Sequence, residues 1–218
     1  MQRATSLLTL VSAMLFVSGV GLSQSKEQQA TMEEKKPKME QKKEVDGKEI
    51  GVIETSMGTI EVELYRSDAP KTVENFVKLA QKKYFDGVIF HRVSKGFVIQ
   101  GGDPTGTGRG GESIYGKEFE DELNSSTASY KTGYKKGVLA MANRGPNTNT
   151  SQFFVMLKDI PSMPKNYTIF GKVIKGLDVV DKIGQVEITP QMGPNDGKPK
   201  VDVVMKKVTV RTESAAKE

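Results

Sequence analysis

Short apolar runs, separated by glycines and polar turns, occupy most of the chain between Ile50 and Thr212. Runs of this kind suit β-strands and are short for helices. The segments expected as strands are 50–65 (a hairpin that turns at Met57 and Gly58), 137–143, 151–157, 167–173 and 201–212. Two segments, 70–84 and 177–183, have apolar residues at helical spacing. Many short strands with two helices predict an all-β domain, either a barrel or a sandwich.

The stretch 90–103 carries the most informative pattern in the chain. Two apolar runs flank a turn at residues 94–96, which predicts a β-hairpin. Arg92 lies in the first run, and a charge among strand-forming apolar residues needs a partner or a function because burying it unpaired is costly. By alternation Phe97 and Gln100 face opposite sides. The pattern alone therefore does not bring Arg92, Phe97 and Gln100 into one pocket.

The helix at 70–84 has a recognisable start. Asp68 is expected to accept amide hydrogen bonds at its N-terminus, and Pro70 fits an early helical position. Further on, residues 106–111 satisfy the G-x-G-x-x-G pattern. A dinucleotide site needs a preceding strand and a following helix, but Pro104 precedes the pattern and no helix start follows. The segment is therefore interpreted as a surface loop.

The composition excludes several kinds of chemistry. Lys and Arg number 32 against 27 Asp and Glu, a net charge of +5, and the scattered bases predict no nucleic-acid partner. With no cysteine the chain has no disulfides, no thiolate metal site and no cysteine nucleophile. With a single histidine, His91, a His-rich metal site is not expected, and His91 itself is interpreted as structural. We expect neither a metal nor another cofactor.

The ends of the chain differ from its middle. Residues 1–25 combine a positive start with an apolar run and predict a signal peptide, so the protein is expected to be exported, periplasmic or secreted. The alternative is an uncleaved anchor, and only then is a membrane a partner. Residues 26–48 are rich in Lys, Glu and Gln and predict a charged, disordered tether. Residues 213–218 are expected to form a disordered tail, which leaves 49–212 as the folded domain.

Seven motifs, in order along the domain, resemble those of the cyclophilin family of peptidyl-prolyl isomerases. They are Phe90-His-Arg-Val, 96–103 (Gly-Phe-Val-Ile-Gln-Gly-Gly-Asp), 110–115, Phe119-Glu-Asp-Glu, Met141-Ala-Asn, Ser151-Gln-Phe-Phe and Phe170-Gly. The resemblance implies a closed eight-stranded antiparallel barrel capped by two α-helices. It also suggests an exported, bacterial-like member of the family.

The resemblance assigns site residues one by one. Arg92 corresponds to the catalytic guanidinium, and Phe97 and Gln100 are grouped with it. The substrate-binding residues implied are Val98, Ala142, Asn143, Gln152, Phe154, Met163 and Tyr167. Alternation along 151–157 assigns Phe154 rather than Phe153 to the pocket. Val98 stands where the family often has methionine, and Tyr167 where many members have histidine.

The implied function is cis-trans isomerisation of X-Pro peptide bonds in folding exported proteins. No bond breaks in this reaction, so neither a nucleophile nor a cofactor is required. The expected partners are proline-containing polypeptides, and the protein is expected to act as a monomer. Two alternatives stay open: a module that only binds a proline motif, and a holding chaperone in which turnover is incidental.

Overall fold

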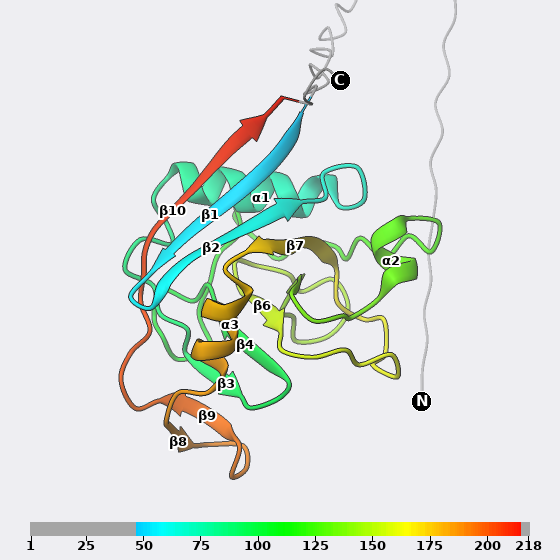
Figure 1. Ribbon diagram of the computed structural model, residues 1–218. Coiled ribbons are helices and arrows are strands. Elements are labelled where there is room, and N and C mark those ends of the chain that lie inside the picture. The colour runs from blue at the N-terminus through cyan, green and yellow to red at the C-terminus, as the bar shows by residue number, and fades with distance from the viewer. Residues whose placement is uncertain (1–46, 215–218) are drawn as a thin grey trace, which may run out of the picture. The chain divides into compact units, whose positions relative to one another are not determined.

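A computed structural model describes residues 47–214 of the protein (Figure 1). The predicted signal peptide (1–25), nearly all of the predicted tether (26–48) and residues 215–218 of the predicted tail lie outside the described residues. No helix among residues 47–214 has both the length and the apolar character needed to cross a membrane.

Ten strands and three α-helices make up the described part of the chain. In chain order they are β1 (Lys48–Thr55), β2 (Gly58–Leu64), α1 (Pro70–Gln81), β3 (Arg92–Ser94), β4 (Val98–Gly101), α2 (Ala128–Thr132), β5 (Val138–Met141), β6 (Phe153–Met156), β7 (Ile169–Lys175), α3 (Leu177–Gly184), β8 (Ile188–Pro190), β9 (Asp196–Pro199) and β10 (Met205–Glu213). The all-β prediction is confirmed, as are the first hairpin and the strands near 137–143, 151–157 and 167–173.

All ten strands belong to one antiparallel sheet, in the order β10-β1-β2-β7-β5-β6-β4-β3-β9-β8. The predicted closed eight-stranded barrel is wrong, because this ladder is open and ends at β10 and β8. The second edge of β3 pairs with β9, where Val93 lies opposite Gly197, so it is not available to β10. A single isolated bridge between Ile89 and Val204 joins the segments that lead into β3 and β10. The β8–β9 hairpin extends the sheet beside β3 (Figure 1).

The prediction of two helices is also corrected, because the described residues contain α2 in addition to α1 and α3. This helix is only five residues long, too short to show an apolar period. The hydroxyl of Thr127 caps it by accepting a hydrogen bond from the Tyr130 amide at 3.4 Å.

The start of α1 differs from the sequence-based expectation. Asp68 does not cap it: its carboxylate accepts a hydrogen bond from the Ser129 amide at 2.9 Å. The cap comes from Glu122, whose carboxylate oxygens accept hydrogen bonds from the amides of Lys71 (3.0 Å) and Thr72 (2.8 Å). A carboxylate 50 residues away satisfies the free N–H groups of the first turn. Local sequence therefore could not reveal it.

Two separate apolar clusters lie on opposite faces of the sheet. The inner cluster contains Ile99, Leu139 and Phe153, together with apolar faces of α1 and α3. The outer cluster is formed by Val98, Tyr134, Val138, Ala140, Phe154, Met156 and Ile169. Neighbouring residues of β4, β5 and β6 alternate between the two clusters, as successive side chains of a strand must. The outer cluster forms part of the candidate site described next.

Candidate active site

The β3–β4 hairpin predicted from sequence is confirmed and sets the register of the site. Arg92 lies opposite Gln100, and on the other edge of β4 Gln100 lies opposite Phe154 of β6. Directly paired residues on adjacent strands project to the same face. The side chains of Arg92 and Gln100 are therefore neighbours on one surface with that of Phe154, which comes from a distant part of the sequence.

Nine of the ten residues assigned from sequence line one pocket on this surface. They are Arg92, Phe97, Val98, Gln100, Ala142, Asn143, Phe154, Met163 and Tyr167. Alternation had placed Phe97 on the opposite face from Gln100, but Phe97 precedes β4 and belongs to the turn. Its amide donates to the Ser94 carbonyl at 2.9 Å, so the strand rule does not apply to it. The tenth residue, Gln152, lies behind the pocket.

The outer cluster supplies the apolar wall of the pocket. Val98 and Phe154 are buried, and Phe97 and Met163 pack against the cluster from the turn and loop above it. The ring of Tyr167 meets that of Phe154 edge to face, with centroids 5.5 Å apart. Aromatic pairs in this geometry are favourable beyond the area they bury. The wall is thus preformed and suited to a small apolar ring.

Arg92 forms the polar wall and is held by three hydrogen bonds. Its Nε and Nη2 donate to the two carboxylate oxygens of Asp196, at 2.8 and 2.6 Å, and its Nη1 donates to Gln100 Oε1 at 3.1 Å. A guanidinium carries five N–H groups. Two of them therefore have no partner among residues 47–214, and 25% of the side chain is exposed. Arg92 can thus donate to a bound group without giving up its own support.

A line of amides extends this support behind the pocket. Gln100 Nε2 donates to Gln152 Oε1 at 3.0 Å. Gln152 Nε2 in turn donates to the carbonyls of Gly108 (3.0 Å) and Gly110 (2.7 Å) in the glycine-rich loop. Gln152 therefore contacts the site through Gln100 rather than through the pocket itself.

Asp103 shapes that loop from within. Its carboxylate is fully buried and accepts hydrogen bonds from the amides of Thr105, Thr107, Gly108 and Gly110. Burial opposes its charge, but the hydrogen bonds from the Thr105 hydroxyl and the loop amides outweigh burial and lower its pKa to about 2. A side chain at position 110 would collide with the carboxylate, since a Cβ there would lie 2.4 Å from Asp103 Oδ1. The interpretation of 106–111 as a loop is confirmed.

Asn143 presents main chain rather than side chain to the groove. Its Nδ2 donates to the Asn166 carbonyl at 2.9 Å, and its Oδ1 accepts a hydrogen bond from the Gly145 amide at 3.3 Å. The backbone N–H and C=O of Asn143 have no hydrogen-bond partner within residues 47–214. An extended peptide could pair with them as an added strand would.

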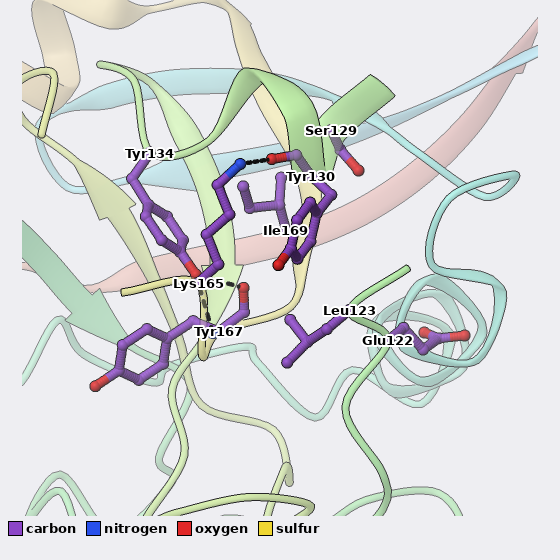
Figure 2. A pocket seen from close by; sticks show the side chains of 8 residues that line it. All are labelled: Glu122, Leu123, Ser129, Tyr130, Tyr134, Lys165, Tyr167 and Ile169. Atoms are coloured by element: carbon purple, nitrogen blue, oxygen red, sulfur yellow. Dashed lines mark hydrogen bonds between the residues drawn. The ribbon is translucent and has the colours of Figure 1, made fainter. Parts of the chain in front are cut away.

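Tyr134 fixes the backbone of Tyr167, and both residues line a neighbouring pocket, which Figure 2 shows. The Tyr134 hydroxyl accepts a hydrogen bond from the Tyr167 amide and donates one to the Tyr167 carbonyl, both at 2.9 Å. Burial raises the pKa of this hydroxyl to about 12, so it stays protonated. In the same view Lys165 donates to the carbonyl of Tyr130. The loop that carries Tyr167 is thereby tied to β5 and α2.

Asp196 and Tyr134 are the two site residues that sequence reasoning missed. Asp196 is 104 residues from Arg92 and lies in a segment broken by prolines and glycines, where no strand was expected. Tyr134 precedes β5 and carries no motif. The predicted hairpin pairs the strand of Arg92 on one edge only. The other edge needs a partner, and this was a signal for a further strand beside Arg92. Across residues 47–214 there is no group of three or more acidic or histidine side chains placed to hold a metal ion.

The geometry defines a class of site: a preformed apolar pocket beside a fixed, partly exposed guanidinium, with free backbone groups along one rim. A family model described as cyclophilin type peptidyl-prolyl cis-trans isomerase/CLD matches residues 50–210. The chain belongs to this family and is a peptidyl-prolyl cis-trans isomerase.

Similar proteins come from plants, fungi and animals. Peptidyl-prolyl cis-trans isomerase CYP18-2 of Arabidopsis thaliana is 53% identical over 135 residues, covering 62% of this chain and 80% of the relative. The ppi1 isomerase of Schizosaccharomyces pombe is 55% identical over 134 residues, covering 62% of this chain and 84% of its own. Human peptidyl-prolyl cis-trans isomerase-like 1 is 54% identical over 144 residues, covering 66% and 84%.

Solved structures agree with the fold. A cyclophilin type isomerase of Cryptosporidium parvum is 37% identical, with a TM-score of 0.68 over 76% of this chain and 99% of the other. The same protein, solved in the presence of the dipeptide Ala-Pro, gives a TM-score of 0.67 over 75% and 99%. The cyclophilin-like fold expected from the motifs is therefore confirmed in its all-β architecture.

Proposed function

We propose that the pocket between Arg92 and Phe154 binds proline and that Arg92 is the catalytic group. The observation that carries this proposal is the geometry of Arg92. Three of its N–H groups are held by Asp196 and Gln100, and two remain free beside an apolar pocket. The structural neighbour solved with Ala-Pro adds support, because that dipeptide contains the expected ring.

The reaction needs this combination of residues. Rotation about a peptide bond is opposed by a barrier of ~18–20 kcal/mol, because the nitrogen lone pair is shared with the carbonyl. At the twisted midpoint the lone pair is localised on nitrogen. A guanidinium N–H that reaches the prolyl nitrogen then stabilises this state more than the planar one, which lowers the barrier. Pre-positioning by Asp196 reduces the reorganisation needed.

The other residues hold the two sides of the rotating bond. Val98, Phe97, Phe154 and Met163 grip the ring, while Gln100 and the free backbone of Asn143 orient the peptide. Ala142, Gln152 and Tyr167 complete the groove, Gln152 through its hydrogen bond to Gln100. With the ring fixed, the acyl side turns. The roles that the resemblance implied are part of the proposal for the other nine residues, and Gln152 is proposed to act through Gln100 rather than on the peptide.

Isomer exchange in a labelled Ala-Pro peptide tests the proposal with the full chain. Nuclear magnetic resonance line shapes report the exchange rate, and shifts in the same samples report binding. An enzyme accelerates exchange at a small fraction of the peptide concentration. A proline-binding module or a holding chaperone, the alternatives left open by the sequence, shifts the resonances and leaves the exchange rate unchanged. The second result would overturn the assignment of Arg92.

We also propose that the protein is exported, acts as a monomer on folding secreted chains, and meets a membrane only if its leader stays uncleaved. The support is the charged start and apolar run of residues 1–25, followed by the charged segment 26–48. The relatives described above are eukaryotic and give the bacterial-like part of the prediction no support. Mass spectrometry of the mature N-terminus tests export: cleavage near Lys26 is expected, and a cytoplasmic product that starts at Met1 or Gln2 contradicts it.

A further inference from the structure

A second pocket adjoins the candidate active site, and we call it the flanking pocket. Arg92 and Gln100 line both pockets, so the two are neighbours across this pair. The flanking pocket is completed by His91 and the glycine-rich loop, and by Gln191, Met192 and Lys198 of the β8–β9 hairpin. A peptide that crosses Arg92 therefore has the flanking pocket within reach.

Every charge that lines the flanking pocket is positive. Arg109 is exposed, and its guanidinium has no hydrogen bond or ion pair with any residue in the range 47–214. Lys198 lies 3.3 Å from Asp202, which does not line the pocket, and the two side chains are 40% and 49% exposed. Ion pairs as exposed as this one are weak, so Lys198 can interact with another anion. The charge of Arg92 is matched by Asp196, which leaves Arg109 and Lys198 as the cations available to a ligand.

The position of Arg109 is fixed relative to the catalytic group. The carbonyls of Gly108 and Gly110, on either side of it, both accept hydrogen bonds from Gln152. Gln152 is joined through Gln100 to Arg92. The backbone at Arg109 is thus connected to the site by three consecutive hydrogen bonds rather than by a free loop.

His91 lines the flanking pocket, with both of its ring nitrogens buried. It is only 6% exposed, and both of its ring nitrogens lack a hydrogen-bond partner in the described part of the chain. Gly108, with φ +78°, passes so close that a Cβ there would lie 3.3 Å from the ring. Burial lowers the pKa of His91; the carboxylate of Asp103 opposes this shift, and the charges of Arg92 and Lys198 add to it. Buried polar groups left without partners are uncommon in packing that serves structure alone.

We propose that the flanking pocket binds an anionic side chain of the substrate, a carboxylate or a phosphate close to the proline. Arg109 and Lys198 supply the attraction, and the shared chemistry of the ligand is its negatively charged oxygens. This inference rests on the proposed isomerase function and adds a preference to it: proline sites flanked by an acidic or phosphorylated residue are turned over faster than neutral ones.

A peptide series with the full chain tests the preference. Each peptide carries one variable residue at the first or second position on either side of an Ala-Pro unit. The residues compared are Glu with Gln, phosphoserine with Ser, and Lys as the opposite charge. At the best position, kcat/KM for the Glu peptide is expected to exceed that for the Gln peptide by about three- to fivefold, the size typical of one partly exposed charge pair. The advantage should shrink at high salt.

The variants Arg109→Gln and Lys198→Gln assign the preference to the flanking pocket. Each is expected to lower the Glu-to-Gln ratio, and the double variant to bring it to about one. Arg109→Glu should favour the Lys peptide instead. Lys206→Gln is the matched control: it removes one exposed charge on β10, outside both pockets, and should keep the parent ratio.

The outcomes separate this inference from the proposed function. Turnover of the neutral peptide shows the isomerase, whatever the charge preference. A Glu-to-Gln ratio of one in the parent protein, or a ratio that survives the double variant, overturns the flanking-pocket assignment. The two sources of the anion are distinguished by the size of the increase in kcat/KM. A much larger increase from Ser to phosphoserine than from Gln to Glu identifies phosphorylated chains as the source. Equal increases identify acidic residues.

Discussion

Phe153 and Phe154 are neighbours on β6 but belong to different regions of the molecule. Phe153 is 1% exposed in the inner cluster, where its ring meets those of Phe76 and Phe85 at 5.8 and 5.9 Å. Phe154 is 5% exposed in the outer cluster and lines the candidate proline pocket beside Tyr167. The two rings are almost equally buried, so burial does not distinguish them. The two rings are distinguished by the residues that surround them.

The comparison teaches how this fold separates stability from function. The buried side chains of the inner cluster, which include residues of the sheet, α1 and α3, are apolar. The outer cluster is bordered by a chain of polar groups from Asp196 through Arg92, Gln100 and Gln152 to the loop. Apolar packing on one side and hydrogen bonds on the other hold a pocket open. Substitutions in the two clusters should therefore have different signatures.

Replacing each phenylalanine by alanine should give the largest effects. Both Phe153→Ala and Phe154→Ala remove a buried ring and should reduce the free energy of unfolding by roughly 3–5 kcal/mol. Only Phe154→Ala should also lower kcat/KM per folded molecule, by tenfold or more, because the ring is part of the pocket. Urea unfolding and peptide exchange on the same samples measure both. Phe154→Leu is the milder variant if the alanine form does not fold, and equal activity losses at 153 and 154 would refute the distinction.

Acid should test the polar border through Asp103. Because hydrogen bonds lower its pKa to about 2, its contribution to stability is complete above the ordinary carboxyl pKa near 4 and is lost as the pH falls towards 2. Asp103→Asn should therefore cost roughly 2 kcal/mol at pH 7 and much less near pH 2. Urea unfolding at several pH values checks this. Asp181→Asn, at a surface ion pair, is the control, and a pH-independent difference at position 103 would count against the assignment.

Asp196→Asn should have a smaller, functional effect. The carboxamide keeps the shape of Asp196 but loses the charge that orients the guanidinium of Arg92. We expect kcat/KM at pH 7 to fall by about tenfold, or ~1.4 kcal/mol of transition-state stabilisation. Asp202→Asn, beyond the same hairpin, should leave turnover of a neutral peptide at the parent rate. Parent-level activity in Asp196→Asn would mean that Gln100 alone positions the guanidinium.

The smallest effect is expected at Tyr134. Tyr134→Phe removes both hydrogen bonds to the backbone of Tyr167 and should cost ~1 kcal/mol of stability. Because the proposed role of Tyr167 is to bind substrate, KM should rise about twofold while kcat stays nearly constant. Tyr130→Phe is the matched control, since the Tyr130 hydroxyl makes no hydrogen bond within residues 47–214. A change in kcat alone would contradict a positioning role.

Local patterns predicted the elements whose causes are local. Turn residues at 94–96 marked the β3–β4 hairpin, and alternation along β6 separated Phe153 from Phe154. The motifs named residues that the fold brings into one pocket, nine of the ten directly. Both kinds of inference depend on neighbours in sequence or on a known arrangement of them.

The features that sequence reasoning did not predict depend on contacts between residues far apart in the chain. The Asp196 carboxylate reaches Arg92 because β9 pairs with β3, yet the prolines and glycines around it conceal a strand. The same pairing leaves the strand ladder open, contrary to the closed barrel that the resemblance implied. Glu122 caps α1 in place of Asp68. Local propensities do not indicate which remote group will accept a hydrogen bond from a free N–H or pair with the edge of a strand.

The most direct test of the central claim measures the exchange rate of one Ala-Pro peptide with Arg92→Ala and Arg92→Lys. Because Arg92 pairs with Asp196, the alanine variant should melt at a lower temperature, and the lysine variant should recover much of that loss by keeping the charge. Catalysis should separate from stability: both variants should lose about two orders of magnitude in turnover per folded molecule, roughly 3 kcal/mol, because an ammonium lacks the planar fork. Peptide affinity should change much less. A folded Arg92→Ala or Arg92→Lys protein that turns over at the parent rate would contradict the account.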